Sequence, residues 1–154
     1  MANIIEIHNF LPHRQPMLMV DFIIDIDSQT VTTQFEIKQD TLFIEDTHFA
    51  AVGLIENAAQ TCSSIVAKTF FDSDDVTNKN DVEVIGFISA IKSLKIHSLP
   101  ETGKIITTKA TLVSRFDTPT YTTCVMDCTT YCDGVLLLEG VINLFIQEQQ
   151  NENK

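Results

Sequence analysis

The chain has 154 residues, of which 44% are hydrophobic and 20% charged, a composition typical of one globular domain. Its formal net charge of −11 argues against nucleic acid and against an anionic membrane surface as partners, because both attract basic proteins. No apolar run approaches the ~18 residues of a membrane span, and the first residues lack the pattern of a secretory signal. We therefore expect a cytoplasmic protein with a single domain over residues 1–150 and a polar tail at 151–154.

The predicted elements begin with strands over 17–27 and 31–37, which alternate apolar and polar residues and are rich in β-branched ones. After a polar break at 44–48, residues 52–71 predict a buried helix, because apolar and small residues recur at helical spacing. An acidic, turn-rich loop at 72–81 leads to strands over 82–97, 104–116, 121–132 and 135–147. Asp133-Gly134, between the last two, is a hairpin signal.

This order predicts an α+β fold in which an antiparallel sheet wraps around one long central helix. An open sheet of this kind leaves an edge strand, and natural proteins pair or cover such edges. We therefore expect a homodimer or a higher even oligomer.

Three of the four cysteines, Cys124, Cys128 and Cys132, recur at every fourth residue of a predicted strand. An even spacing puts them on one face of that strand. Zinc sites use cysteine pairs that close a tight loop, which neighbouring strand positions do not close easily. We interpret the cysteines as small buried hydrophobes and expect no metal and no cofactor.

Residues 86–115 form a net-basic segment with five lysine and arginine residues against a single acid, Glu101. One interpretation is chance on solvated strand faces. The alternative is a landing site for an anionic ligand or partner.

Glu56 is the only acid in the apolar helix predicted over 52–71, which makes it a candidate general acid or base. The alternative is a glutamate of the first turn that is favoured by the helix dipole. Gln60 lies one turn later on the same face, where it could orient the carboxyl group. Gly53 could offer its N–H to an oxygen that gains charge, or could simply give the helix entry its backbone freedom.

His13 and Arg14 lie between two prolines, Pro12 and Pro16, which stiffen the backbone just before the first strand. His13 is either a turn histidine bonded to the backbone or a residue at the mouth of an active site. His48 follows a polar run and is either a surface residue or a catalytic partner of Glu56.

The stretches LPHRQPMLMVD at 11–21 and HFAAVGLIENAAQ at 48–60 resemble the hot-dog-fold β-hydroxyacyl-acyl-carrier-protein dehydratases. That family has a Leu-Pro-His-Arg-x-Pro segment before its first strand and an Ile-Glu-Ala-x-Ala-Gln-like run in its central helix, which residues 55–60 match. The resemblance covers roughly residues 10–147. It implies a hot-dog fold and dehydration of a 3-hydroxyacyl thioester on acyl carrier protein to a 2-enoyl thioester, in fatty-acid-like or aryl-polyene pigment synthesis.

The resemblance also implies roles for single residues. Glu56 would be catalytic with either His13 or His48 as its partner, and the helix N-terminus at Gly53 would serve the thioester carbonyl. The residues implied near the substrate are Arg14, Gly53, Gln60, Gly86 and Phe87. Carrier proteins of this kind are acidic, so Lys92 and Lys95 of the basic segment would form the docking site.

One departure from the family pattern keeps other functions open. The family's catalytic histidine lies in His-Phe-Pro-Gly, whereas His48-Phe49 is followed here by Ala50-Ala51, and the gap to Glu56 is several residues shorter. One alternative is a non-catalytic partner subunit that pairs with another hot-dog dehydratase chain. The other is a hot-dog acyl thioesterase, in which the helix acid activates water.

Overall fold

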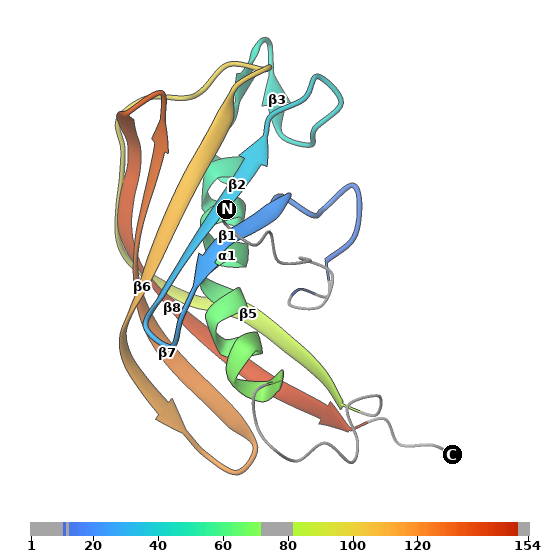
Figure 1. Ribbon diagram of the computed structural model, residues 1–154, viewed down its shortest axis with the longest axis vertical. Coiled ribbons are helices and arrows are strands. Elements are labelled where there is room, and N and C mark those ends of the chain that lie inside the picture. Colours follow the sequence, from blue (N-terminus) through green and yellow to red (C-terminus); the bar gives the residue numbers. More distant parts are fainter. Residues whose placement is uncertain (1–10, 12, 72–81, 151–154) are drawn as a thin grey trace.

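The computed structural model describes residue 11, residues 13–71 and residues 82–150, and Figure 1 shows their arrangement. The loop predicted at 72–81 and the tail at 151–154 lie outside the described residues. A long helix, α1 (Ala51–Phe71), lies against a six-stranded antiparallel sheet with the strand order β1-β2-β6-β7-β8-β5. The strands of this sheet are β1 (Phe22–Ile26), β2 (Thr30–Glu36), β5 (Val82–Ile96), β6 (Ile105–Asp117), β7 (Tyr121–Cys132) and β8 (Val135–Gln150).

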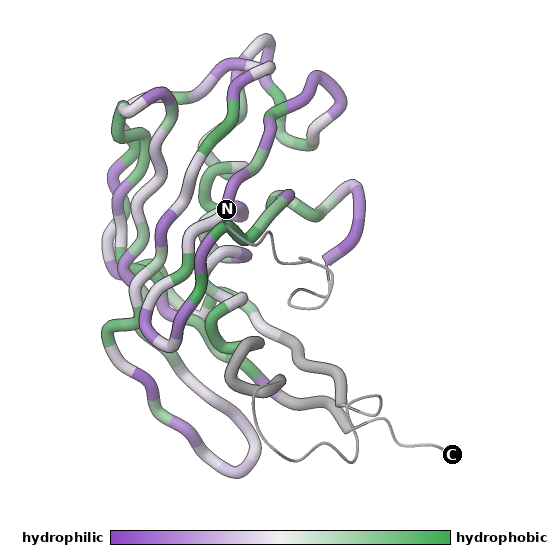
Figure 2. Tube along the Cα trace, viewed as in Figure 1, coloured by the Kyte–Doolittle hydropathy of each residue, from purple (hydrophilic) through white to green (hydrophobic). Residues whose placement is uncertain are grey.

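The predicted α+β architecture, an antiparallel sheet curled around one central helix, is therefore confirmed. Along β2 and β7 buried positions alternate with more exposed ones, and Figure 2 shows hydrophobic and hydrophilic residues interleaved along the sheet strands. This alternation is typical of antiparallel strands with only one face on the core. The helix covers that face and makes contacts with β2, β5, β6, β7 and β8.

The first strand starts later than the sequence predicts. Residues 15–17 form a turn and 18–20 are outside any strand, so β1 begins at Phe22 rather than at residue 17. The physical reason is that the Met17 carbonyl and both backbone polar groups of Met19 bond to side chains of the helix instead of a neighbouring strand. Strand pairing begins only where the Asp21 N–H donates to the Gln34 carbonyl.

The polar break predicted at 44–48 contains a small hairpin of its own. β3 (Ile44–Glu45) pairs with β4 (His48–Phe49) across a turn in which Asp46 has a φ of 55°. Aspartate tolerates this left-handed conformation better than most residues, which lets a polar stretch close a tight turn. This hairpin lies at the N-terminal end of α1 (Figure 1).

The hairpin predicted at Asp133-Gly134 is confirmed. Both residues have positive φ angles, 50° and 77°, as the two central positions of a type I′ turn require. The turn joins β7 to β8 with a register that pairs Cys132 with Val135.

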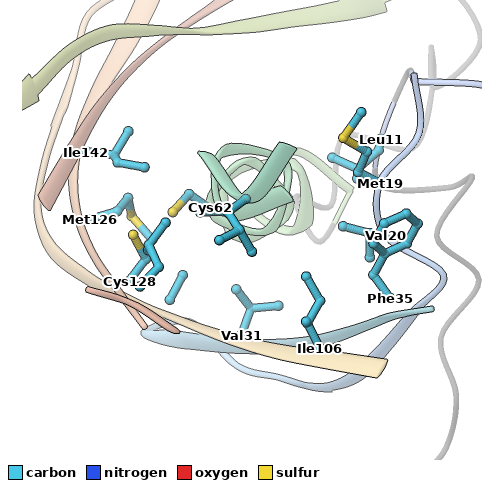
Figure 3. Close-up of a cluster of buried hydrophobic side chains, with 14 of the residues drawn as sticks. Leu11, Met19, Val20, Val31, Phe35, Cys62, Ile106, Met126, Cys128 and Ile142 are labelled. Atoms are coloured by element: carbon cyan, nitrogen blue, oxygen red, sulfur yellow. The ribbon is translucent and has the colours of Figure 1, made fainter. Parts of the chain in front are cut away.

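The core lies between α1 and the inner face of the sheet, as seen along the helix in Figure 3. Four residues of the predicted apolar stripe, Leu54, Ala58, Cys62 and Ile65, are each 0% exposed. The stripe as predicted continues to Ala67 and Lys68, whose side chains lie outside the described part of the chain. Cys62 points from the helix toward Met126 and Cys128 (Figure 3). Leu11, Met19 and Val20 pack on another side of the same helix.

The interpretation of the cysteines as buried hydrophobes is also confirmed. Cys124, Cys128 and Cys132 lie at alternate buried positions of β7, and all are free thiols. Burial raises the pKa of Cys124 to about 11, so this thiol stays protonated at neutral pH. Within the described ranges, no helix is both long enough and apolar enough to cross a membrane.

Candidate active site

The candidate site lies where the His13 segment, residues 13–20, packs against the first half of α1. His13 Nε2 lies 3.8 Å from Glu56 Oε1, and the two side chains are 24% and 29% exposed. Together they open onto a cavity of about 200 Å³. The cavity is lined by His13, by Glu56, Ala59, Gln60 and Ser63 of α1, by Gly86, Phe87 and Ile88 of β5, and by Leu144 of β8.

Arg14 shapes the turn that presents His13. Its guanidinium Nη1 donates to the carbonyls of Leu11 at 2.9 Å and of His13 at 2.8 Å. The Arg14 carbonyl accepts hydrogen bonds from the N–H groups of Met17 and Leu18. Arg14 is exposed and folds back on its own segment, and it is not among the residues that line the cavity.

Gln60 connects Glu56 to the His13 segment. Its Nε2 donates to Glu56 Oε1 at 3.0 Å and to the Met17 carbonyl at 2.8 Å. Its Oε1 accepts from the Met19 N–H at 2.8 Å. Because Gln60 is only 1% exposed, water does not compete for these bonds, and the amide holds the carboxyl group in a defined orientation.

The surroundings of His13 favour a neutral imidazole. Burial lowers the pKa of His13; the Glu56 carboxylate raises it in part, and the Arg14 guanidinium lowers it further. Nδ1 is buried without a hydrogen-bond partner among the described residues, so no acceptor there stabilises the charged, doubly protonated ring. A neutral imidazole with a lowered pKa can accept a proton at neutral pH.

His48, the other histidine predicted as a partner of Glu56, lies away from the cavity. It is in the β3–β4 hairpin, where its Nε2 is 3.8 Å from Glu101 Oε1 and its Nδ1 is 3.2 Å from Thr47 Oγ1. The His48 side chain is 43% exposed and is not among the residues that line the cavity. Within this one chain, the structure brings His13, and not His48, to Glu56.

Gly53 lies in the first turn of α1, as predicted, but its N–H donates to the Ala50 carbonyl at 3.0 Å. A Cβ at this position would collide with the ring of Phe49. The glycine is therefore required for close packing of the β3–β4 hairpin on the helix, and it is not among the cavity-lining residues.

Gly86 and Phe87 do line the cavity, from strand β5. A Cβ at Gly86 would lie 3.3 Å from Ile146 Cγ1 and 3.7 Å from Ser63 Oγ, so the missing side chain keeps this wall open. Phe87 is half exposed and stacks on Phe145, with the ring centroids 5.1 Å apart.

The basic segment is spread over two strands, β5 and β6, that are not neighbours in the sheet. Lys92 and Lys95 are exposed on β5, the strand that also carries Gly86. Lys104 is paired with Asp133 at 2.9 Å, so its charge is already compensated.

The sequence did not identify the cavity-lining residues Ala59, Ser63, Ile88 and Leu144, nor Asn57 beside the site. Ser63 lines the cavity and lies seven residues after Glu56, a spacing that keeps it on the same helix face and could have identified it. Asn57 is 1% exposed, and its Nδ2 donates to the Met19 carbonyl at 2.7 Å. A polar residue inside an apolar helix was the available signal for Asn57.

No three histidine, cysteine, aspartate or glutamate residues of the described part of the chain are grouped so that they could hold a metal ion. Among the residues that line the cavity, His13 and Glu56 are the two with titratable side chains.

Solved structures of other proteins share the fold. The dehydratase heterocomplex ApeI:P from Xenorhabdus doucetiae superposes with a TM-score of 0.71 at 18% identity, over 95% of this chain and 91% of that one. The PaaI protein of E. coli gives a TM-score of 0.60 at 11% identity, over 79% of each chain. At such identities these likenesses show the fold alone.

Curated relatives match over a shorter stretch. The 3-hydroxyacyl-acyl-carrier-protein dehydratase FabZ of Rhizobium johnstonii is 45% identical over 75 residues, which is 44% of this chain and 47% of the relative. FabZ of Rhizobium etli is 44% identical over 75 residues. The chain thus spans about half the length of the curated relatives that it matches.

The sequence model of the ApeP-like family, described as ApeP dehydratase, matches residues 5–153, nearly the whole chain. This match agrees with the hot-dog fold and with the resemblance carried by residues 11–21 and 48–60. The chain belongs to the ApeP-like dehydratase family.

Proposed function

We propose that this protein dehydrates a 3-hydroxyacyl thioester, delivered on acyl carrier protein, to a 2-enoyl thioester. The observation that carries the proposal is the His13–Glu56 pair, 3.8 Å apart at one cavity. Membership of the ApeP-like family and the partial match to FabZ dehydratases support the same reaction.

The reaction needs a base for the proton α to the thioester carbonyl and an acid for the departing hydroxyl group. Neutral His13 takes the α proton at Nε2, the ring nitrogen that faces Glu56. That proton passes to the Glu56 carboxylate, which delivers it to the hydroxyl group. The hydroxyl leaves as water while the double bond forms, and both side chains return to their starting states. Gln60, bonded to Glu56 Oε1, holds the carboxyl group in place through this cycle.

Strand β5 is the surface at which we expect a second subunit to bind. This strand is at one edge of the sheet, and residues 89–93 along it are exposed. Unpaired strand edges favour pairing with another chain. We propose that β5 pairs with a second hot-dog chain, identical or related. The similar structure from Xenorhabdus doucetiae is itself named as a dehydratase heterocomplex.

A non-catalytic role as a partner subunit is the second candidate, and one observation favours it. Ala50-Ala51 follow His48-Phe49 in place of the proline and glycine of the family's catalytic motif. In that case His13 and Glu56 would be remnants of the site, and a different hot-dog chain would supply the activity.

The test is a turnover assay with 3-hydroxyacyl thioesters of several chain lengths on acyl carrier protein. Enoyl thioester formation, lost in Glu56→Gln and in His13→Asn, is the expected result. Release of free thiol instead would favour the thioesterase. No turnover alone, but turnover after mixing with a second hot-dog chain even when Glu56 is replaced, would favour the non-catalytic partner subunit.

A further inference from the structure

The alignment of His13 with Glu56 depends on how the His13 segment is fixed to α1. Both backbone polar groups of Met19, which is fully buried, are bound by helix side chains. Gln60 Oε1 accepts from the Met19 N–H at 2.8 Å, and Asn57 Nδ2 donates to the Met19 carbonyl at 2.7 Å. The segment is therefore held by two amide side chains, one turn apart, rather than by strand pairing.

The Asn57 amide is itself oriented from the sheet. Thr108 Oγ1 on β6 donates to Asn57 Oδ1 at 2.7 Å. Thr108 Oγ1 also lies 2.8 Å from Thr130 Oγ1 on β7. Because the Thr108 proton goes to Asn57, Thr130 must donate to Thr108, and a directed chain of hydrogen bonds runs from β7 through β6 and α1 to Met19. Such buried chains strengthen each bond in turn.

We propose that Asn57 is a positioning residue for the acid–base pair, oriented by Thr108. This inference rests on the proposed dehydratase function. Asn57 touches neither the cavity nor the reacting groups: its side chain fixes Met19, and Met19 fixes the short segment that carries His13. Small displacements of a catalytic group reduce turnover strongly, even when the altered residue is remote from the chemistry.

The sheet offers a matched control for Thr108. Thr33 on β2 is directly opposite Thr108 in the β2–β6 pairing, and both are 0% exposed. Thr33 Oγ1 lies 2.7 Å from Thr61 Oγ1 of α1, so it makes the same kind of buried bond to the same helix. Thr61 Oγ1 in turn donates to the main-chain carbonyl of Asn57 at 2.9 Å, which takes no part in the bond to Met19. Thr33→Val therefore removes a comparable buried bond without releasing the Asn57 side chain, and it measures the structural cost.

The experiment compares Thr108→Val, Thr108→Ser, Asn57→Ala and Thr33→Val in the full-length protein. We expect Thr108→Val to lower kcat roughly tenfold and Asn57→Ala up to about a hundredfold, with KM little changed. Thr108→Ser keeps the hydroxyl group and should restore turnover to within about twofold of wild type. Thr33→Val should keep its turnover while losing thermal stability like Thr108→Val.

A second measurement does not depend on turnover. NMR titration of the His13 ring, assigned with His13→Asn, follows its pKa directly. Burial lowers this pKa, while Glu56 and Arg14 are the charged groups beside the ring, so release of the segment should raise it toward its ordinary value. We expect that rise in Thr108→Val and Asn57→Ala but not in Thr33→Val.

The two readouts separate the two proposals. An inactive wild type overturns the dehydratase function, while the titration still tests whether Asn57 positions His13. An active wild type in which Thr108→Val and Thr33→Val lose turnover equally, with the His13 pKa unchanged in both, overturns the positioning role.

Discussion

Two of the histidine–glutamate pairs of this protein have the same separation but different surroundings. His13 Nε2 lies 3.8 Å from Glu56 Oε1, and His48 Nε2 lies 3.8 Å from Glu101 Oε1. The first pair is about one quarter exposed and lines a cavity. In the second pair, 43% of the histidine and 65% of the glutamate side chain are exposed.

The comparison shows that separation alone does not define an acid–base site. An exposed ion pair is screened by water and contributes little. Around the partly buried pair, burial lowers the pKa of His13, an amide bonds to the Glu56 carboxyl group, and a cavity lies beside both side chains. Because of these surroundings, His13 and Glu56 are candidates for acid–base catalysis. The following predictions test whether the two pairs differ in this way.

The largest expected effect separates the two glutamates. Glu56→Gln should lower dehydratase turnover by about 10²-fold or more, because positioned acid–base groups contribute that much. Glu101→Gln and His48→Ala should change turnover by less than about threefold, on the same reasoning that exposed pairs contribute little. Steady-state kinetics with one carrier-bound substrate measure all three variants.

Equal losses in His48→Ala and Glu56→Gln would contradict this assignment. They would instead place His48 of one subunit at Glu56 of another. Mixing the two inactive variants would then restore part of the activity, because one of the mixed sites would have both intact residues.

The next effect concerns stability at the hairpin end. Gly53→Ala forces a Cβ into the ring of Phe49, and overpacking of this kind costs about 1–3 kcal/mol. The melting temperature should fall by roughly 2–4 °C for each kcal/mol. Gly86→Ala at the cavity meets only ordinary or slightly tight contacts, so it should change melting less and substrate KM more. Differential scanning calorimetry and kinetics of both variants check this contrast.

A smaller effect is expected for the exposed lysines of β5, which we propose as the docking site for the carrier protein. Replacing Lys92 and Lys95 by glutamine should raise KM for a carrier-bound substrate roughly three- to tenfold at low salt, because surface charges mainly guide encounter. KM for a small thioester without carrier should not change. Lys109→Gln, an exposed lysine on β6, is the matched control. An equal effect of Lys109→Gln would contradict docking along β5.

The smallest expected effect is on the pH dependence of stability. Burial lowers the pKa of His13 in the folded protein, whereas the unfolded chain has the ordinary value near 6.5. Between these two values the unfolded chain binds more protons, so the free energy of unfolding decreases as pH falls below about 6.5. Denaturant unfolding at pH 7.5 and 5.5 should show a smaller decrease in His13→Asn. Parallel decreases in both proteins would contradict the buried environment.

The sequence predicts the framework of this fold well because its signals are local and periodic. The stripe of Leu54, Ala58 and Cys62 identifies the buried helix face, and Asp133-Gly134 identifies its hairpin through backbone geometry alone. Glu56 and Gln60 were recognisable as one-face neighbours for the same reason.

The remaining features depend on partners that are distant in sequence. The start of β1 was misplaced because Asn57 and Gln60, about forty residues away, take the hydrogen bonds of Met17 and Met19. The β3–β4 hairpin was missed because its turn uses a left-handed aspartate rather than glycine. No local pattern states which of His13 and His48 meets Glu56, since that depends on packing between segments.

The position of strand β5 links the choice of partner chain to the choice of substrate. Gly86 and Phe87 belong both to the wall of the cavity and to the edge strand of the sheet (Figure 1). A chain that paired with β5 as proposed would lie beside two residues of the cavity wall. A genome that encodes several such partners would obtain several substrate preferences from one copy of this chain, and duplication of the partner alone would be enough to create a new one.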